Sequence, residues 1–78
     1  MTDVNMPDLG EGVTEGIVAR WHKRTGDAVR AGEPLVDVET EKTTTEVAAP
    51  ASGVLGDIAV DEGNTAQIGA RLAVIHQR

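Results

Sequence analysis

One lysine at a sharp turn is the residue of this sequence best suited to carry chemistry. Lys42 lies in the run Glu39-Thr40-Glu41-Lys42-Thr43, between two segments with the alternating pattern of strands. Nothing in this run would bury a charge, so we expect the amine to face solvent, where another enzyme can modify it covalently. An exposed lysine on a turn is more often a solvated charge that protects a sheet edge from pairing.

Three features of its surroundings favour a modified lysine over a solvated one. The lysine falls at the junction of two halves of the chain that repeat one pattern. Its neighbours are small enough to leave the amine accessible to another enzyme: Thr40, Thr43 and Thr44. Acidic residues surround it and offer a surface that a ligase can read: Glu39, Glu41 and Glu46.

The internal repeat predicts where the lysine lies in the fold. A shift of 37 residues superposes glycines and apolar residues without a gap: Gly16 on Gly53, Gly26 on Gly63, Gly32 on Gly69 and Leu35 on Leu72. Glycines beside Asp or Asn mark turns, and matched apolar residues mark equivalent strands. We therefore expect two copies of one β-unit about a pseudo-twofold axis. The same shift takes the turn of Lys42 to the two termini, so Lys42 is expected at the opposite end of the domain.

The hydrophobic pattern has a period of two and predicts an all-β fold. Val36 and Val38 should point one way and Asp37 the other, and the alternation groups three residues of another segment on one face: Ile17, Ala19 and Trp21. No segment has convincing helical periodicity. We expect two small sheets in a sandwich or flattened barrel. The expected strands lie near 3–7, 16–22, 34–40, 43–49, 53–60 and 71–76, with short pieces near Val29 and Ala66.

Composition restricts the classes of function. The 78 residues form one domain, 1–78, whose only aromatic residue, Trp21, is expected to pack against an aliphatic core. Seven basic and thirteen acidic residues give a net charge of −6, which argues against nucleic-acid binding. No apolar run approaches the roughly 20 residues that span a bilayer, and no signal sequence is visible, so we expect a soluble domain with no membrane partner.

The sequence offers little for catalysis or metal binding. There is no cysteine, and the two histidines, His22 and His76, have no matched ligand spacing, so neither a thiol nucleophile nor a metal site is expected. The run Gly10-Glu11-Gly12 is not a phosphate loop, because no lysine or helix follows it. We interpret this run instead as part of a flexible loop over residues 8–15.

The whole chain resembles the lipoyl domains of 2-oxo acid dehydrogenase acyltransferases. The matching segments are Met6-Pro7-Asp8-Leu9-Gly10-Glu11-Gly12-Val13-Thr14-Glu15-Gly16, Trp21, Gly26-Asp27-Ala28-Val29, Pro34-Leu35, Glu39-Thr40-Glu41-Lys42, Glu46-Val47, Pro50, Gly53 and Gly63. The resemblance implies two four-stranded antiparallel sheets, a barrel-sandwich hybrid, with lipoic acid in amide linkage on Lys42. The family usually has Asp before this lysine and Ala after it, where this chain has Glu41 and Thr43.

The resemblance also implies partners for a domain without catalytic residues of its own. They are a lipoate ligase, a thiamine-diphosphate 2-oxo acid decarboxylase that acylates the arm, an acyltransferase core that passes the acyl group to coenzyme A, and a dihydrolipoamide dehydrogenase. The implied location is the bacterial cytoplasm. Two groups of residues are the candidate recognition surface: Glu39, Thr40, Glu41 and Thr43 around the arm, and Leu9, Gly10, Glu11 and Gly12 in the loop beside it.

Two alternatives share the fold that the resemblance implies. A biotin carboxyl carrier domain also uses a lysine at this turn, but biotin acceptors typically have Met on both sides, where this chain has Glu41 and Thr43. An unmodified structural domain of the same fold is the second alternative, and the intact hairpin argues against it. The sequence does not say which 2-oxo acid is served.

Overall fold

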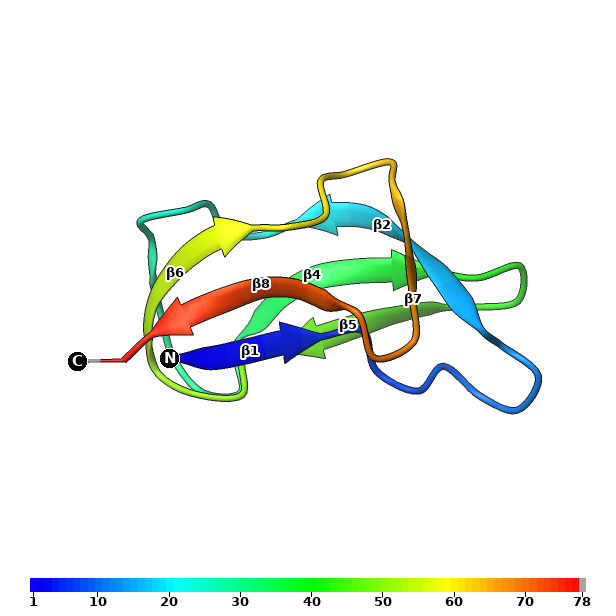
Figure 1. Cartoon of the computed structure of the whole chain (residues 1–78), viewed down its shortest axis with the longest axis horizontal. Helices are drawn as coiled ribbons and strands as arrows, with labels where there is room; N and C mark the ends of the chain where they lie inside the picture. The colour runs from blue at the N-terminus through cyan, green and yellow to red at the C-terminus, as the bar shows by residue number, and fades with distance from the viewer. Residues whose placement is uncertain (78) are drawn as a thin grey trace.

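The computed structural model describes residues 1–77, which form eight β-strands and no helix (Figure 1). The strands are β1 (Thr2–Asn5), β2 (Glu15–Trp21), β3 (Ala28–Val29), β4 (Pro34–Glu39), β5 (Thr44–Ala48), β6 (Gly53–Ile58), β7 (Thr65–Gln67) and β8 (Arg71–His76). Each expected strand is present, with ends within two residues of those predicted. In the described part of the chain, no helix is long and apolar enough to cross a membrane.

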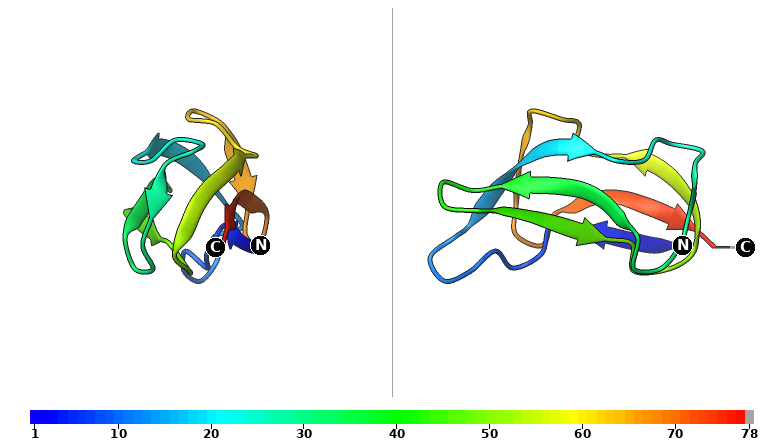
Figure 2. Two further views of the ribbon diagram at one scale, coloured as in Figure 1. Left: turned by 90° about the vertical axis from the view of Figure 1, so that its left-hand side faces the viewer. Right: turned by 180° about the vertical axis from the view of Figure 1, so that it is seen from behind.

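The strands form two four-stranded antiparallel sheets that face each other (Figure 2). One sheet has the order β1-β8-β6-β3 and is called the terminal sheet, because it holds the first and last strands. The other has the order β5-β4-β2-β7 and is called the hairpin sheet, because it holds the β4–β5 hairpin. The predicted fold class is confirmed.

The internal repeat appears directly in the order of the strands. A shift of 37 residues takes β2 onto β6, β3 onto β7 and β4 onto β8, and the order of the hairpin sheet then becomes that of the terminal sheet, with β1 in the place of β5. Backbone hydrogen bonds repeat with it: Gly26 donates to the Leu55 carbonyl at 2.8 Å, and Gly63 donates to the Val18 carbonyl at 2.7 Å. The predicted duplication is therefore confirmed. Each half contributes one short strand, β3 or β7, to the sheet of the other half.

The core lies between the two sheets and is aliphatic. It contains no polar or charged residue among those described, and Val36 and Val38 are completely buried. Asp37, between them, points outward as predicted and is only partly covered. Trp21 is half-buried at the edge of the core, where its ring nitrogen donates to the Val60 carbonyl at 2.9 Å. The fully buried large side chains are Met6, Leu35, Leu55, Leu72, Ile75, Val4, Val18, Val36 and Val38.

The face predicted for β2 is wrong at one residue. Ile17 is 46% exposed, and its neighbour Val18 is completely buried. The register between β2 and β4 shifts between Val18 and Arg20, which marks a β-bulge, and this returns Trp21 to the core side. A strict period of two cannot represent an extra residue in a strand, so it placed Ile17 and Trp21 on one face.

The two ends of the molecule have different roles. The start of β1 and the end of β8 lie at one end, and the turn between β4 and β5 lies at the other (Figure 1). The molecule measures 37 Å along its longest axis and 20 and 17 Å across. The turn that holds Lys42 is therefore far from the start of β1 and the end of β8, in agreement with the repeat.

The two glycines that the repeat equates, Gly16 and Gly53, should differ in their tolerance of alanine. A methyl group on Gly53 would overlap the backbone carbonyl of His76 in the paired strand, which cannot move alone. On Gly16 it would meet mainly a side-chain methyl of Leu9, 2.8 Å away, which can rotate. We expect Gly53→Ala to lower the free energy of unfolding by about 3 kcal/mol and Gly16→Ala by about 1 kcal/mol, within the usual cost of overpacking. Urea denaturation measures both, and equal losses would contradict the packing described here.

Candidate functional site

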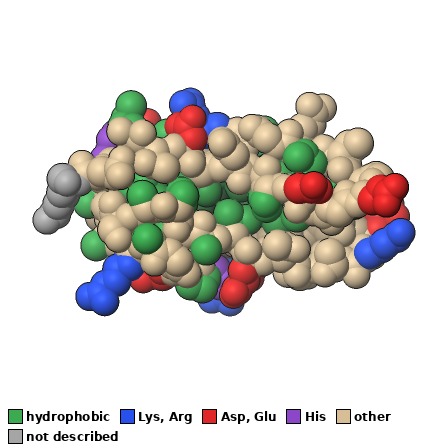
Figure 3. Space-filling model, turned by 90° about the horizontal axis from the view of Figure 1, so that it is seen from below, with side chains coloured by type: hydrophobic (Ala, Val, Ile, Leu, Met, Phe, Trp, Pro, Cys, Tyr) green, Lys and Arg blue, Asp and Glu red, His purple; other side chains and the backbone are tan. Residues whose placement is uncertain are grey.

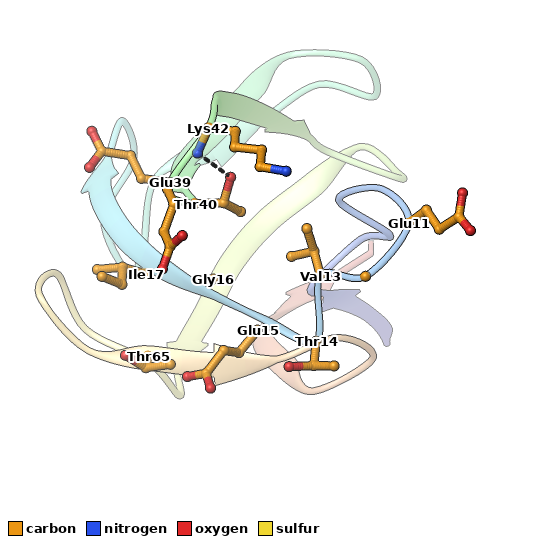
Figure 4. Close-up of a pocket in the computed structure, with 12 residues that line it drawn as sticks. Glu11, Val13, Thr14, Glu15, Gly16, Ile17, Glu39, Thr40, Lys42 and Thr65 are labelled. Atoms are coloured by element: carbon orange, nitrogen blue, oxygen red, sulfur yellow. Dashed lines mark hydrogen bonds between the residues drawn. The ribbon is translucent and has the colours of Figure 1, made fainter.

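The turn between β4 and β5 is held by the side chain of Thr40. The Thr40 backbone N–H donates to the Thr43 carbonyl at 2.8 Å and closes the turn. The Thr40 hydroxyl oxygen accepts a hydrogen bond from the backbone N–H of Lys42 at 3.3 Å (Figure 4). It accepts a second hydrogen bond from the backbone N–H of Thr43, also at 3.3 Å. Local hydrogen bonds therefore satisfy these backbone groups, and the Lys42 side chain takes no part in holding the turn.

The two lysines of the chain differ in their surroundings. Lys42 is exposed, and no carboxylate of residues 1–77 lies within ion-pair distance of its ammonium nitrogen. Lys23 pairs with Glu33 at 2.9 Å, and about a third of its side-chain surface is exposed. Lys42 is thus the more accessible amine for an enzyme that forms an amide.

An open groove of about 530 Å³ lies between this turn and residues 11–17, which form the end of the loop over 8–15 and the start of β2 (Figure 4). Four carboxylates line it, and Lys42 is the only basic residue of the lining. Modification of Lys42 to an amide would remove this positive charge and leave an acidic groove. The groove is lined by Glu11, Gly12, Val13, Thr14, Glu15, Gly16, Ile17, Glu39, Thr40, Glu41, Lys42 and Thr65.

The loop over 8–15 reaches this groove through two tight turns. The Asp8 carboxylate accepts a hydrogen bond from the Gly10 N–H at 3.0 Å, and the Val13 N–H donates to the Gly10 carbonyl at 3.2 Å. Gly10 and Gly12 have φ angles of 117° and 81°, which other residues rarely adopt. The turns place Glu11 at the side of the groove opposite the β4–β5 turn (Figure 4).

The structure brings most, but not all, of the predicted recognition residues together. Those that line the groove are Glu11, Gly12, Glu39, Thr40 and Glu41, whereas Gly10 and Thr43 lie outside its lining. Leu9 also lies outside and is half-buried against the core. Glu46, expected in the acidic surround of Lys42, lies instead beside Asp37 on the outer face of the hairpin sheet.

The candidate recognition residues did not include six residues of the groove: Val13, Thr14, Glu15 and Gly16, which directly follow the loop candidates in the chain, and Ile17 and Thr65. Thr65 belongs to the short strand β7, which pairs with β2 so that Thr65 is opposite Ile17. Ile17 is one of only two large apolar side chains exposed among the described residues, the other being Met1. No local pattern in the sequence marks either residue, because their placement depends on the β-bulge and on a strand pairing between distant segments.

The biotin and lipoyl attachment family, described as Biotin-requiring enzyme, matches residues 2–75. The chain belongs to this family. It is 54% identical to the dihydrolipoyllysine-residue acetyltransferase component of the pyruvate dehydrogenase complex from Mycobacterium bovis, over 92% of this chain and 13% of that protein. It is 45% identical to the succinyltransferase component of the 2-oxoglutarate dehydrogenase complex from Bartonella vinsonii, over 95% of this chain and 18% of that protein.

A solved structure identifies the branch of the family. The lipoyl domain of the 2-oxoglutarate dehydrogenase complex from Azotobacter vinelandii superposes with a TM-score of 0.81 at 39% identity and covers 99% of this chain and 98% of that one. The urea carboxylase of Kluyveromyces lactis contains the same fold, with a TM-score of 0.73 at 28% identity over 97% of this chain and 7% of that one. The predicted resemblance to lipoyl domains is confirmed. The chain spans less than a fifth of the curated relatives named above.

Truncation of Lys42 and truncation of Trp21 should have different effects on the free energy of unfolding, because only Trp21 contributes to the fold. Lys42→Ala removes an exposed side chain that makes no ion pair within residues 1–77, so we expect the free energy of unfolding to change by no more than about 0.5 kcal/mol. Trp21→Ala removes a half-buried ring and its hydrogen bond, and we expect a loss of about 2 kcal/mol. Thermal melts of both variants measure this, and the reverse ranking would overturn the placement of both residues.

Proposed function

We propose that this domain is a carrier that holds lipoic acid in amide linkage on the side-chain nitrogen of Lys42. The observation that carries the proposal is the exposed amine at the tip of a turn whose backbone is already satisfied by Thr40. The turn lies at the end of the molecule opposite the start of β1 and the end of β8, so an arm on Lys42 extends away from those strand ends (Figure 1). These residues fit a covalently attached acid, which needs an accessible amine and no enclosing pocket.

In this proposal the domain itself only positions the arm. Lipoic acid, when bound, supplies a dithiolane that can accept an acyl group and two reducing equivalents. The β4–β5 hairpin holds the attachment point on a rigid sheet, and the local hydrogen bonds of Thr40 fix the backbone at Lys42. Tethering raises the effective concentration of the carried group at a partner's active site to roughly millimolar.

Lipoate is favoured over biotin as the attached group. Glu41 and Thr43 flank the lysine, where biotin acceptors typically have Met. The relatives described above are named as dihydrolipoyllysine components of dehydrogenase complexes, and the solved relative of matching length is a lipoyl domain. An exposed lysine alone would also fit an unmodified structural domain of this fold, and the names of the relatives favour the carrier over that alternative.

The proposed partners are those of a 2-oxo acid dehydrogenase complex. They are a lipoate ligase, a thiamine-diphosphate 2-oxo acid decarboxylase, the acyltransferase core and a dihydrolipoamide dehydrogenase, acting in the bacterial cytoplasm. Relatives of this chain belong to both pyruvate and 2-oxoglutarate dehydrogenase complexes, so the proposal extends to this class of complex and not to one 2-oxo acid.

We further propose that the decarboxylase reads the acidic groove beside the arm. A lipoyl-lysine arm is chemically the same on every such domain, so a partner has to distinguish carriers by the protein surface. Four carboxylates lie on the two sides of the groove. Glu11 in the loop and Glu15 at the start of β2 are on one side, and Glu39 at the end of β4 and Glu41 in the turn are on the other. Charges of one sign in a groove steer partners of complementary charge.

Modification should depend on Lys42 alone. We expect Lys42→Arg, which keeps the charge but cannot form the amide, to gain no mass when it is co-expressed with a lipoate ligase. Lys23→Arg changes the only other lysine, which is paired with Glu33, and should gain one lipoyl group like the native domain. Intact mass spectrometry measures all three and also distinguishes lipoate from biotin. A lipoyl mass on Lys42→Arg would move the site elsewhere.

Recognition by the decarboxylase should depend on the groove carboxylates. Glu11→Gln with Glu15→Gln removes two charges but keeps Leu9 packed on the core, so the fold should be unchanged. We expect roughly tenfold lower kcat/KM for reductive acylation, with lipoylation by the ligase nearly unchanged. The matched control, Asp3→Asn with Asp57→Asn, makes the same change in net charge on the terminal sheet, outside the groove. If both pairs acylate equally fast when fully lipoylated, the groove is not the recognition surface.

A further inference from the structure

Three side chains that can bind a metal converge on the hairpin sheet, away from the groove. They are His22, which follows β2, Asp37 on β4 and Glu46 on β5. One nitrogen or oxygen atom from each lies within 4.8 Å of the others, and His22 Nε2 is 3.0 Å from an Asp37 oxygen. These residues are 15 and 9 positions apart in the chain, so only the pairing of three strands brings them together.

The strand register forces the two carboxylates to be neighbours. Asp37 pairs directly with Glu46 across β4 and β5, and the buried Val36 and Val38 hold Asp37 on the outer face of the sheet. Like charges directly opposite one another in adjacent strands destabilise a sheet. A bound cation that neutralises the two carboxylates would therefore stabilise the pairing of β4 with β5.

The protein itself supplies little positive charge at this cluster. Within residues 1–77, no lysine or arginine lies within 4.0 Å of either carboxylate, although Arg20 is opposite Asp37 in the register. The contact that the structure does provide is the imidazole of His22, whose backbone N–H is anchored to the Leu35 carbonyl at 2.7 Å. A neutral imidazole offers a lone pair for a metal but no charge.

We infer that His22, Asp37 and Glu46 form a binding site for a divalent transition-metal ion of the zinc type. Imidazole nitrogen and carboxylate oxygen are both donor atoms that zinc binds, and an imidazole ligand favours zinc over magnesium or calcium. Zinc–ligand distances of about 2.0–2.2 Å require donor atoms closer together than 4.8 Å. The side chains of His22 and Asp37 are 28% and 24% exposed, so an ion can reach them from solvent.

The ion would link three adjacent strands of the hairpin sheet. Two of them, β4 and β5, are the strands that hold the turn of Lys42, so bound zinc would stiffen the support of the arm. None of the three ligands lines the groove beside Lys42. The site is therefore independent of lipoylation, and its test does not depend on the proposed carrier function.

Zinc titration of the unlipoylated domain, without an affinity tag, tests the inference. Calorimetry should show one zinc ion per chain, and zinc should raise the Tm, as a ligand that binds only the folded state does. His22→Gln and Glu46→Gln should each weaken zinc binding by at least roughly tenfold, since each removes one of three donors. His76→Gln is the matched control, because it removes the only other imidazole and should leave the affinity unchanged. Magnesium at the same concentration should cause no shift in Tm.

Several results would overturn the inference. One is a native domain that binds no zinc, and another is a His22→Gln variant that binds it with native affinity. Loss of binding in His76→Gln with retention in Glu46→Gln would place any zinc elsewhere. Circular dichroism of each variant without metal shows whether it is folded. If His22→Gln does not fold, the zinc affinity of Glu46→Gln, which changes an exposed side chain conservatively, still tests the site.

Discussion

The burial of one aliphatic core between two small sheets is the constraint on which the rest of the structure depends. With a single tryptophan and no other aromatic residue, the chain has to exclude water with Val, Leu, Ile and Ala, whose side chains fill only a thin layer. The chain forms this thin aliphatic core from two copies of one β-unit, each of which covers the apolar face of the other. Because β3 and β7 each join the sheet of the opposite half, neither half can bury its apolar face without the other.

This core also determines what the surface can present. Once Val36 and Val38 point inward, the alternation of β4 directs Asp37 and Glu39 outward, and the hairpin carries Lys42 to the end of the molecule. Charged and polar side chains can therefore lie at that end of the molecule and on the outer face of the sheet without disturbing the packing of the core. Figure 3 shows acidic and basic side chains around the rim of one face, with apolar atoms between them. The carrier role needs only this: a stable support and an amine at its tip.

Much of the fold was predictable because it is encoded in local and repeated patterns. Glycines such as Gly26 and Gly63 recur at the same turn, and their φ angles of 96° and 88° show why glycine is used at both. The prediction failed at Ile17, because the β-bulge beside Val18 adds a residue that a period of two does not contain. Bulges depend on how a strand fits its partner, which a local pattern does not reveal.

The sequence by itself therefore determined the strands, the duplication and the end of the molecule at which Lys42 lies, since each follows from periodicity along the chain. Tertiary structure decided which side chains meet. It moved Glu46 away from the arm and beside Asp37 and His22, and it brought Thr65 next to Ile17 at the groove. Those neighbours come from pairing between distant segments, and their register is fixed by the fit of the whole core, which no single segment encodes.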